Sequence, residues 1–356
     1  MRRQPSNTPT DLRGAMAQED AWRERWSRQL ALDQVGEEGQ RALGRATVAV
    51  VGAGALGSNS AELLARMGVG SLRVLDRDVL EPSNIHRQRV LGEADINRPK
   101  AEALAERLHA LVPACKVEGV VEDVSPSNAL GLLEGADVVV DGLDSMRARY
   151  VLNDACLELG VPWVYGGVVA TGGMAAAFPA GGPCLRCLFP EMPAKDALPT
   201  CESEGIHPSV PAVVAGIQVA EASRLILGQK FQPRLIALDL WSGEWRAVEL
   251  SKRAGCPACG EGRRDFLAAG DRDTVTTLCG HGTVQISPAA RRGPIDLDAK
   301  AGEWRGKGLK ATRTGPVLTL DLGEHRLHLF ASGRALVKGT TEAATAKSIY
   351  ARYVVK

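Results

Sequence analysis

Apolar residues follow two alternating patterns through the first half of the chain. Short runs rich in β-branched residues predict buried parallel strands, and they occupy residues 46–51, 72–75, 117–121, 136–140 and 162–165. Between these runs, apolar positions recur every three to four residues, which predicts helices up to Met67, over 99–111 and over 145–159. Gly68 and Gly160 follow two of these helices and are expected to end them in the left-handed conformation. The alternation predicts an α/β fold with a Rossmann-like, doubly wound, mostly parallel sheet.

The pattern changes after Gly166. Residues 172–178 predict an antiparallel strand, an apolar helix is predicted over 210–227, and strands follow over 235–241 and 246–250. We therefore expect antiparallel strands to extend the parallel sheet.

Three regions are expected along the chain. Residues 1–20 are polar and predict a disordered tail, and a helix-prone segment over 21–45 opens a main domain that covers 21–260. An Arg/Gly-rich stretch over 260–273 predicts a linker to a small α+β domain at 270–356. That domain is expected to contain strands near 283–286, 317–320, 326–330 and 335–338 and a final helix from Glu342.

Composition excludes several classes of protein. Lys and Arg (43) nearly balance Asp and Glu (42) over 356 residues, which argues against bulk electrostatic binding to nucleic acid or membranes. The N-terminal residues lack the apolar core of a signal peptide, and no apolar run approaches a transmembrane span. We expect a cytoplasmic protein, in which a metal explains the eight cysteines better than disulfides do.

A glycine-rich loop, Gly52-Ala53-Gly54-Ala55-Leu56-Gly57, lies between a predicted strand and a predicted helix. Such a loop directs backbone N–H groups and the helix dipole at one point, where a phosphate binds. Asp76, at the end of the next strand, is placed to accept hydrogen bonds from ribose hydroxyls. A tight turn without a ligand is the alternative, and the loop does not say which adenine nucleotide binds.

Charged residues near the same sheet edge favour a triphosphate over a dinucleotide. Lys100 stands in the first turn of a helix, where a cation opposes the helix dipole, and Arg87 and Arg89 add positive charge. A solvated surface lysine is the alternative for Lys100. Asp144 follows a strand end and suits Mg²⁺ or phosphate binding, whereas Asp141 could equally be a turn aspartate.

Two Cys-x-x-Cys pairs, Cys184/Cys187 and Cys256/Cys259, have the spacing of zinc ligands. Four thiolates complete a tetrahedral site and leave no position for a substrate, so we expect a structural Zn²⁺. Cys201 lies among polar residues without a partner at useful spacing, so it is either a nucleophile in sulfur transfer or a packing residue.

These motifs, in this order, resemble the ThiF/MoeB/HesA family of adenylating enzymes, the bacterial relatives of ubiquitin-activating enzymes. The resemblance covers about residues 25–260. It rests on Arg25-Trp26-Ser27-Arg28-Gln29, the glycine loop, Leu75–Val79, Ser83–Gln88, Pro99-Lys100, Asp141–Asp144, both cysteine pairs, Thr200-Cys201 and the segment from Gln218 to Leu227. The chain departs from the family at Ser145, where Asn is usual, and at Trp26, where Tyr is usual.

The resemblance implies an activity and its parts. The family adenylates the C-terminal Gly-Gly carboxylate of a ubiquitin-like sulfur carrier protein with MgATP, and a separate donor such as a cysteine desulfurase or rhodanese supplies the sulfur. The family is usually homodimeric, so Arg28 is expected to reach into the partner subunit's site. If Cys201 takes part, it would form a covalent link with the carrier at the sulfur stage. The nucleotide and Mg²⁺ ligands are expected to be Gly52, Gly54, Gly57, Asp76, Asn84, Arg87, Gln88, Lys100 and Asp144.

Three other functions share parts of this pattern. A nicotinamide dehydrogenase would use the glycine loop but not Lys100, Arg28 or a closed four-cysteine site. An enzyme that adenylates a modified tRNA base would need a basic surface, which the near-neutral charge disfavours. A non-catalytic binder of a ubiquitin-like protein would bind the carrier without chemistry.

Overall fold

A computed structural model describes residues 9–193, 203–270, 274–278, 282–288 and 294–355. Its main feature is an eight-stranded sheet with the order β3-β2-β1-β4-β5-β6-β7-β8. The first five strands are mutually parallel, and the last three add in antiparallel fashion. They are β1 (Thr47–Val51), β2 (Ser71–Leu75), β3 (Lys116–Val120), β4 (Val138–Asp141), β5 (Trp163–Val169), β6 (Gly172–Phe178), β7 (Arg234–Asp239) and β8 (Glu244–Glu249). The predicted parallel sheet with an antiparallel extension is confirmed.

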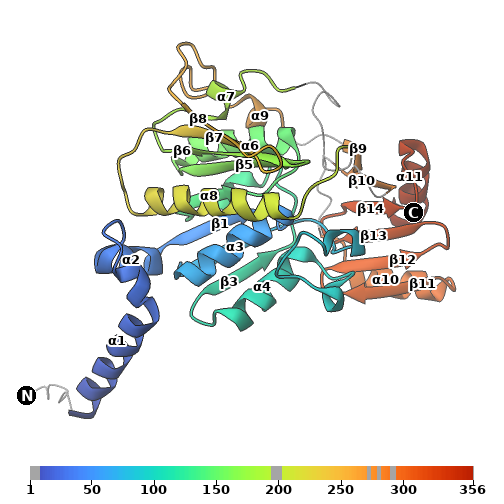
Figure 1. The fold of residues 1–356 in the computed structure, drawn as a ribbon. Coiled ribbons are helices and arrows are strands. Elements are labelled where there is room, and N and C mark those ends of the chain that lie inside the picture. The colour runs from blue at the N-terminus through green and yellow to red at the C-terminus, as the bar shows by residue number, and fades with distance from the viewer. Residues whose placement is uncertain (1–8, 194–202, 271–273, 279–281, 289–293, 356) are drawn as a thin grey trace, which may run out of the picture.

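Helices cover both faces of this sheet (Figure 1). Alternate residues of β1 separate the two cores: Val48 and Val50 pack in one cluster, and Ala49 and Val51 in the other. The first cluster includes α3, α4 and α8, and the second includes α5 and α6. These helices are α3 (Ala55–Met67), α4 (Lys100–Leu111), α5 (Ala129–Leu133), α6 (Met146–Leu159) and α8 (Ser209–Ile226). The sequence did not predict α5, which is one short turn of helix.

Two predicted stop signals are confirmed. Gly68 after α3 and Gly160 after α6 both adopt left-handed backbone, with φ of 92° and 68°. Neither helix could end this way with a β-branched residue at low cost, so glycine fixes both boundaries.

The N-terminal region differs from expectation. Helix α1 spans Pro9–Leu30, so residues 9–20 are helical rather than a disordered tail, and α2 (Gly36–Arg45) is a separate helix. Gly36, with φ of 56°, ends the turn between them. Exposed ion pairs join the two helices, including Arg23 to Glu37 at 2.7 Å.

Helix α8 also corrects an expectation, because it is long and apolar enough to cross a membrane. Its 18 residues have a mean hydropathy of 1.2. In this structure α8 packs against α3, β5 and β6, and its Gln218 is buried and hydrogen-bonded. Core helices share this composition, so α8 by itself assigns no membrane location.

The described residues after 273 include a second, six-stranded antiparallel sheet with the order β11-β12-β13-β14-β10-β9. Trp304 of α10 and leucines of β12 and β13 fill its core. The strands are β9 (Thr274–Leu278), β10 (Thr283–Ser287), β11 (Lys310–Thr314), β12 (Val317–Asp321), β13 (Arg326–Phe330) and β14 (Ala335–Lys338), and the helices are α10 (Leu297–Gly306) and α11 (Ala343–Tyr350), followed by a π-helical turn at Ala351–Val355. The sequence missed β9, β11 and α10.

The expected linker is partly structured. Helix α9 (Asp265–Ala268) packs on α6, where the Phe266 N–H donates to Asp154 at 2.9 Å and its ring lies 4.7 Å from that of Tyr150. Residues 260–270 therefore belong to the main domain rather than to a spacer.

Candidate active site

The glycine loop joins β1 to α3 and packs against the turn after β4. Gly52 has φ of 97°, and a Cβ there would lie 2.5 Å from the Gly142 carbonyl oxygen. At Gly57 a Cβ would lie 1.7 Å from the Gly52 carbonyl oxygen. Gly54 differs, because it is partly exposed and the nearest atom to its Cβ position is 3.9 Å away. Packing therefore requires Gly52 and Gly57, whereas Gly54 leaves open backbone at a helix N-terminus, where anions bind well.

Asp76 ties the end of β2 to this loop. Its two carboxylate oxygens accept the Ala53 N–H at 2.6 Å and the Asp78 N–H at 2.7 Å. Burial raises the pKa of Asp76 against the opposing charge of Lys100. The residue lies where the sequence placed it, beside the glycine loop at the carboxyl edge of the sheet.

Lys100 begins α4 and is not a surface residue. Its side chain is only 11% exposed, and its Nζ lies 3.6 Å from Asp78 Oδ2, so the solvated-surface alternative is wrong. Burial opposes the charged form, but Asp78, Asp76 and Asp144 outweigh it and raise the pKa of Lys100 above its usual value. The ammonium is thus held charged, with its counter-ions at the edge of the sheet.

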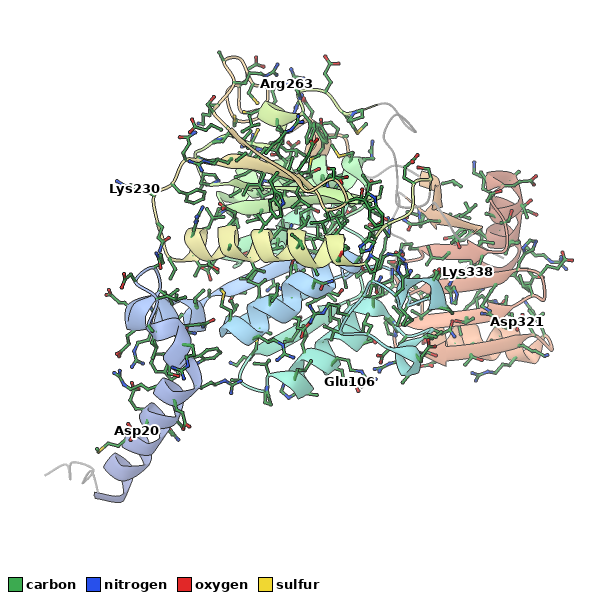
Figure 2. The ribbon with its side chains drawn as sticks, in the orientation of Figure 1. Asp20, Glu106, Lys230, Arg263, Asp321 and Lys338 are labelled. Carbon is green, nitrogen blue, oxygen red and sulfur yellow. The ribbon has the colours of Figure 1, made fainter. Side chains whose placement is uncertain are left out.

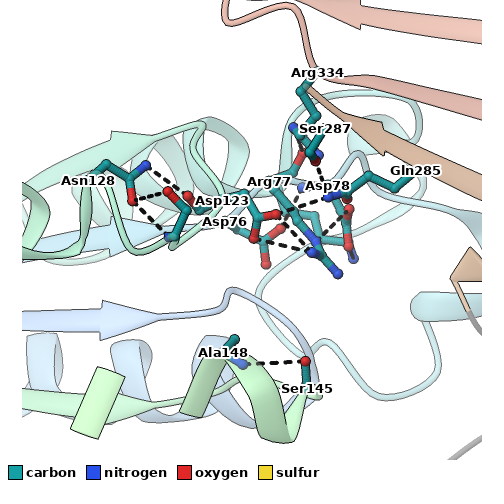
Figure 3. A network of polar contacts seen from close by, with 12 residues as sticks. Asp76, Arg77, Asp78, Asp123, Asn128, Ser145, Ala148, Gln285, Ser287 and Arg334 are labelled. Carbon is teal, nitrogen blue, oxygen red and sulfur yellow. Dashed lines mark hydrogen bonds and ion pairs between the residues drawn. The ribbon is translucent and has the colours of Figure 1, made fainter. Parts of the chain in front are cut away.

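The two aspartates after β4 have different environments. Asp141 is buried, 2.8 Å from Arg149 Nε, and accepts the Leu143 N–H at 2.8 Å, so it holds the turn. Asp144 is exposed, and its negative charge raises the pKa of Lys100 and of Arg149. Ser145 caps α6 by accepting the Ala148 N–H (Figure 3). Asp144 is therefore the aspartate of this turn that remains available to a cation.

The loop after β2 carries the predicted phosphate ligands. Asn84 ends a short 3₁₀ helix (Pro82–Asn84) and is buried, and Arg87 is half-buried and donates to the Ser83 carbonyl at 2.7 Å. Gln88 is 2% exposed, and its Oε1 has no hydrogen-bond partner among the described residues. A buried acceptor without a partner is costly, which suits a residue that completes its bonding with a ligand.

A second layer of charge lies behind Asp76 (Figure 3). Arg77 donates to both oxygens of Asp123 at 3.2 and 3.1 Å, and Gln285 donates to Asp123 at 3.0 Å. Arg334 donates to the Arg77 carbonyl. Gln285 and Arg334 belong to the C-terminal domain, so two parts of the chain far apart in sequence meet beside the glycine loop.

The four predicted metal ligands meet at one point. Cys184 precedes the short helix α7 (Leu185–Leu188), which contains Cys187, and the four Sγ atoms of the two pairs all lie within 4.8 Å of one another. The Cys184–Cys256 and Cys187–Cys259 sulfur separations are 3.7 and 3.3 Å. These fit the edge of about 3.8 Å of a tetrahedron with Zn–S bonds of about 2.3 Å. The donor set can hold a metal.

The family follows from comparison with known proteins. Residues 26–258 match the ThiF family. The chain belongs to the ThiF family. The match begins within α1 and ends between the cysteines of the second pair, so it covers the glycine loop, Lys100 and Asp144. The family resemblance that the sequence motifs indicated is confirmed.

Relatives in the ThiF family match the chain over most of their own length. It is 37% identical over 335 residues to the Bacillus subtilis sulfur carrier protein ThiS adenylyltransferase, covering 93% of this chain and 99% of that protein. It is 41% identical over 246 residues to the Haloferax volcanii SAMP-activating enzyme E1, covering 68% and 91%. The structure of Escherichia coli MccB shares the fold, with a TM-score of 0.58 at 19% identity over 66% of this chain and 72% of that one.

Two predicted residues of this ThiF-family chain need separate comment. Arg28 is exposed on the last turn of α1 and forms no ion pair with a described residue, and Cys201 lies outside the described residues. Sequence reasoning gave no role to Asp78, although its motif was recognised. It missed Arg334 entirely, since nothing near a β-turn arginine signals a contact made 257 positions away.

Proposed function

We propose that this protein adenylates the C-terminal Gly-Gly carboxylate of a ubiquitin-like sulfur carrier protein with ATP. The observation that carries the proposal is the buried, charged Lys100 beside the glycine loop, with Asp78 and Asp76 around it. A dinucleotide dehydrogenase has no use for a cation held there. The Bacillus relative, a sulfur carrier protein ThiS adenylyltransferase, and the Haloferax relative, a SAMP-activating enzyme E1, support the same reaction.

The chemistry needs positioning and charge neutralisation rather than a strong base. The carrier carboxylate is already a nucleophile; it attacks the α-phosphorus of ATP, the bond to the bridging oxygen breaks, and acyl-adenylate and pyrophosphate form. Open backbone at Gly54 and the side chains of Asn84, Arg87, Gln88 and Lys100 would bind the phosphates, with Asp76 at the ribose. Fixed positive charge at the α-phosphorus favours the transition state, where charge develops on leaving pyrophosphate.

Asp144 is the proposed ligand of Mg²⁺. It is exposed at the carboxyl edge of the sheet, and a single carboxylate with phosphate oxygens and water is a typical Mg²⁺ environment. When bound, the ion would neutralise phosphate charge. Asp141 is not proposed for this role, because Arg149 and two backbone N–H groups already occupy its carboxylate.

The four cysteines would bind a structural Zn²⁺. Cys184, Cys187, Cys256 and Cys259 supply all four tetrahedral positions, so the ion would join α7 to the segment after β8 without taking part in adenylation.

Arg28 is proposed to act in the site of a second copy of the chain. Its neighbour Gln29 donates to the Met67 carbonyl at 3.0 Å, which lies at the end of α3 opposite the glycine loop. An α-helix of this length spans about 20 Å, farther than an arginine side chain reaches. A homodimer would allow Arg28 of one copy to approach the phosphates of the other.

After adenylation, a separate sulfur donor would convert the acyl-adenylate to a thiocarboxylate. Cys201 would form a covalent link with the carrier at this second stage. The receiving pathway, whether thiamine, molybdopterin, thiolated tRNA or an amino acid, depends on which carrier binds.

The test is ATP–pyrophosphate exchange with a purified carrier of about 70–100 residues that ends in Gly-Gly. We expect exchange that requires the carrier, is abolished by Lys100→Ala or Asp144→Ala, and survives Cys201→Ala. Full exchange in the first two variants would remove the site assignment. Loss of exchange in a folded Cys201→Ala protein would contradict the proposed division between the two stages.

Other outcomes would favour the other functions. Carrier binding without exchange would indicate a non-catalytic binder, and exchange stimulated by tRNA in a protein that shifts tRNA on a gel would indicate base adenylation. Tight NADH binding without ATP binding would indicate a dehydrogenase.

A further inference from the structure

The C-terminal sheet docks on the carboxyl edge of the main sheet, close to the glycine loop. An apolar contact joins Val79, after β2, to Val317, Phe330 and Leu336 of the C-terminal strands. At one side of this contact Lys338 forms an ion pair with Glu81, and it lies at the boundary of the two sheets (Figure 2). Ligands of open α/β sheets bind at this edge, so the docked domain lies against the wall of the nucleotide site.

Arg334 of the docked domain contacts the backbone that follows β2. It lies in the turn between β13 and β14, is 5% exposed, and its guanidinium stacks 3.7 Å from the Phe330 ring centre. One nitrogen donates to the Arg77 carbonyl, while Nη1 has no hydrogen-bond partner among the described residues. A buried guanidinium placed against backbone in this way fixes that backbone, because its planar fork has few alternative positions.

We propose that Arg334 is a positioning residue for ATP: it fixes the Arg77–Asp78 backbone and so places the Asp78 carboxylate that holds Lys100. The inference rests on the proposed function for the identity of the nucleotide. It adds that the nucleotide site of this chain is completed by its C-terminal domain, through a residue that touches neither ATP nor carrier.

The charges around Asp78 are consistent with this role. Asp78 lies 3.7 Å from Arg77 Nε and 3.6 Å from Lys100 Nζ. Burial would raise its pKa, but Lys100, Arg77 and Arg334 together hold it at about 2. Asp78 therefore stays ionised between two cations that belong to the main domain and one that belongs to the docked domain.

The experiment compares full-length variants in two assays. ATP affinity is measured by calorimetry without carrier, and KM values for ATP and carrier are measured by pyrophosphate exchange. Arg334→Met should weaken ATP binding about tenfold, which is the loss typical when a residue that orients a ligand-binding side chain is removed. The KM for ATP should rise by the same factor. KM for the carrier should stay unchanged. Arg334→Lys, which keeps the charge but not the fork, should recover part of the affinity.

Arg326→Met is the matched control, because Arg326 is an exposed arginine at the start of β13. It should bind ATP as the unsubstituted protein does. Equal ATP affinity in the Arg334→Met and unsubstituted proteins would overturn the proposal, as would equal losses in the Arg334 and Arg326 variants. If Arg334→Met does not fold, Arg334→Lys with unchanged ATP affinity overturns it instead. If the unsubstituted protein binds ATP but shows no pyrophosphate exchange, only the proposed function is overturned.

Discussion

Lys100 and Asp144 show how residue identity and burial together define the candidate site. The lysine is almost enclosed yet charged, and the aspartate that adds to its stabilisation is exposed to solvent. A buried cation needs counter-ions, whereas an exposed carboxylate needs none and can bind a metal. Lys100 therefore supplies a fixed positive charge to the candidate phosphate site, and Asp144 supplies a carboxylate that is available to a cation.

The glycine loop offers a matched pair of substitutions. Gly52→Ala places a Cβ 2.5 Å from the Gly142 carbonyl at a φ of 97°, so we expect loss of stability of about 2–4 kcal/mol together with loss of ATP binding. Gly54→Ala meets nothing closer than 3.9 Å and should keep the melting temperature while weakening ATP binding. Thermal unfolding and ATP titration measure both. A Gly54→Ala protein with unchanged ATP affinity would contradict the phosphate role of the loop.

At this scale the sequence located most site residues but not their partners. Gly52, Asp76 and Lys100 carry local signals: a strand end, a glycine spacing and a helix start. The sequence favoured Asp144 as the ligand but left the role of Asp141 open, because that role depends on the Arg149 contact and on the backbone fold of the loop. Arg334 carried no signal, since its role depends on how two sheets dock.

Elements with strong apolar periodicity were the ones that the sequence predicted well. The parallel strands and α3, α4 and α6 agree within a few residues, because each buries a face in a core. Strand β11 (KATRT) is an edge strand with mostly exposed residues, so no alternation marks it. Helix α10 buries Leu297, Ala301 and Trp304 at helical spacing, but the charged residues between them diluted the signal.

Strand β13 contains a residue that should make the C-terminal sheet sensitive to acid. His328 is 2% exposed, and its Nδ1 lies 2.9 Å from Thr319 Oγ1 on β12. Burial, with nearby Lys338, Arg326 and Arg334, lowers its pKa to about 3. The pKa of His328 is lower in the folded protein than in the unfolded one. Its contribution to the free energy of unfolding is therefore full above about pH 6.5 and is lost as pH falls toward 3, by up to about 5 kcal/mol.

The His328→Leu variant tests this dependence. It should lose about 1 kcal/mol at neutral pH, where the Thr319 contact is removed, but should show a flatter fall in stability between pH 6.5 and 4. Urea unfolding of the full chain across that range measures the slope. His109→Leu, at an exposed position on α4, is the control and should keep the original slope. Equal slopes in all three proteins would show that another group governs the acid response.

The cysteine cluster makes a prediction for the elements that it joins. We expect one zinc per chain by metal analysis, and Cys187→Ser should lose it and lower the melting temperature, because α7 and the segment after β8 lose their link. Cys115→Ser changes a buried cysteine outside the cluster and should retain the metal. Full metal content in Cys187→Ser would rule out the four-thiolate site.

At the scale of the whole molecule, the chain places its functional parts at opposite ends of the main sheet. Helix α1 extends away from the body at one end, and the C-terminal sheet covers the other (Figure 1). Gly68 lies under α1, where an added Cβ would be 2.7 Å from the Trp26 ring, so α1 is anchored at the end of α3. A single copy therefore keeps Arg28 away from the glycine loop, and only assembly could bring the two together.

Mixing two inactive variants tests this assembly. If Arg28 acts in the partner subunit's site, a mixed dimer of Arg28→Ala and Lys100→Ala chains contains one site with both residues intact, contributed by different chains. Random exchange of subunits makes half of the dimers mixed, and each restores one of two sites, so about a quarter of the unsubstituted exchange rate should return. The measurement is pyrophosphate exchange before and after subunits are allowed to exchange, with size-exclusion chromatography to confirm a dimer. If Arg28 acted within its own chain, no mixed dimer would contain a complete site, and the mixture would remain as inactive as its components.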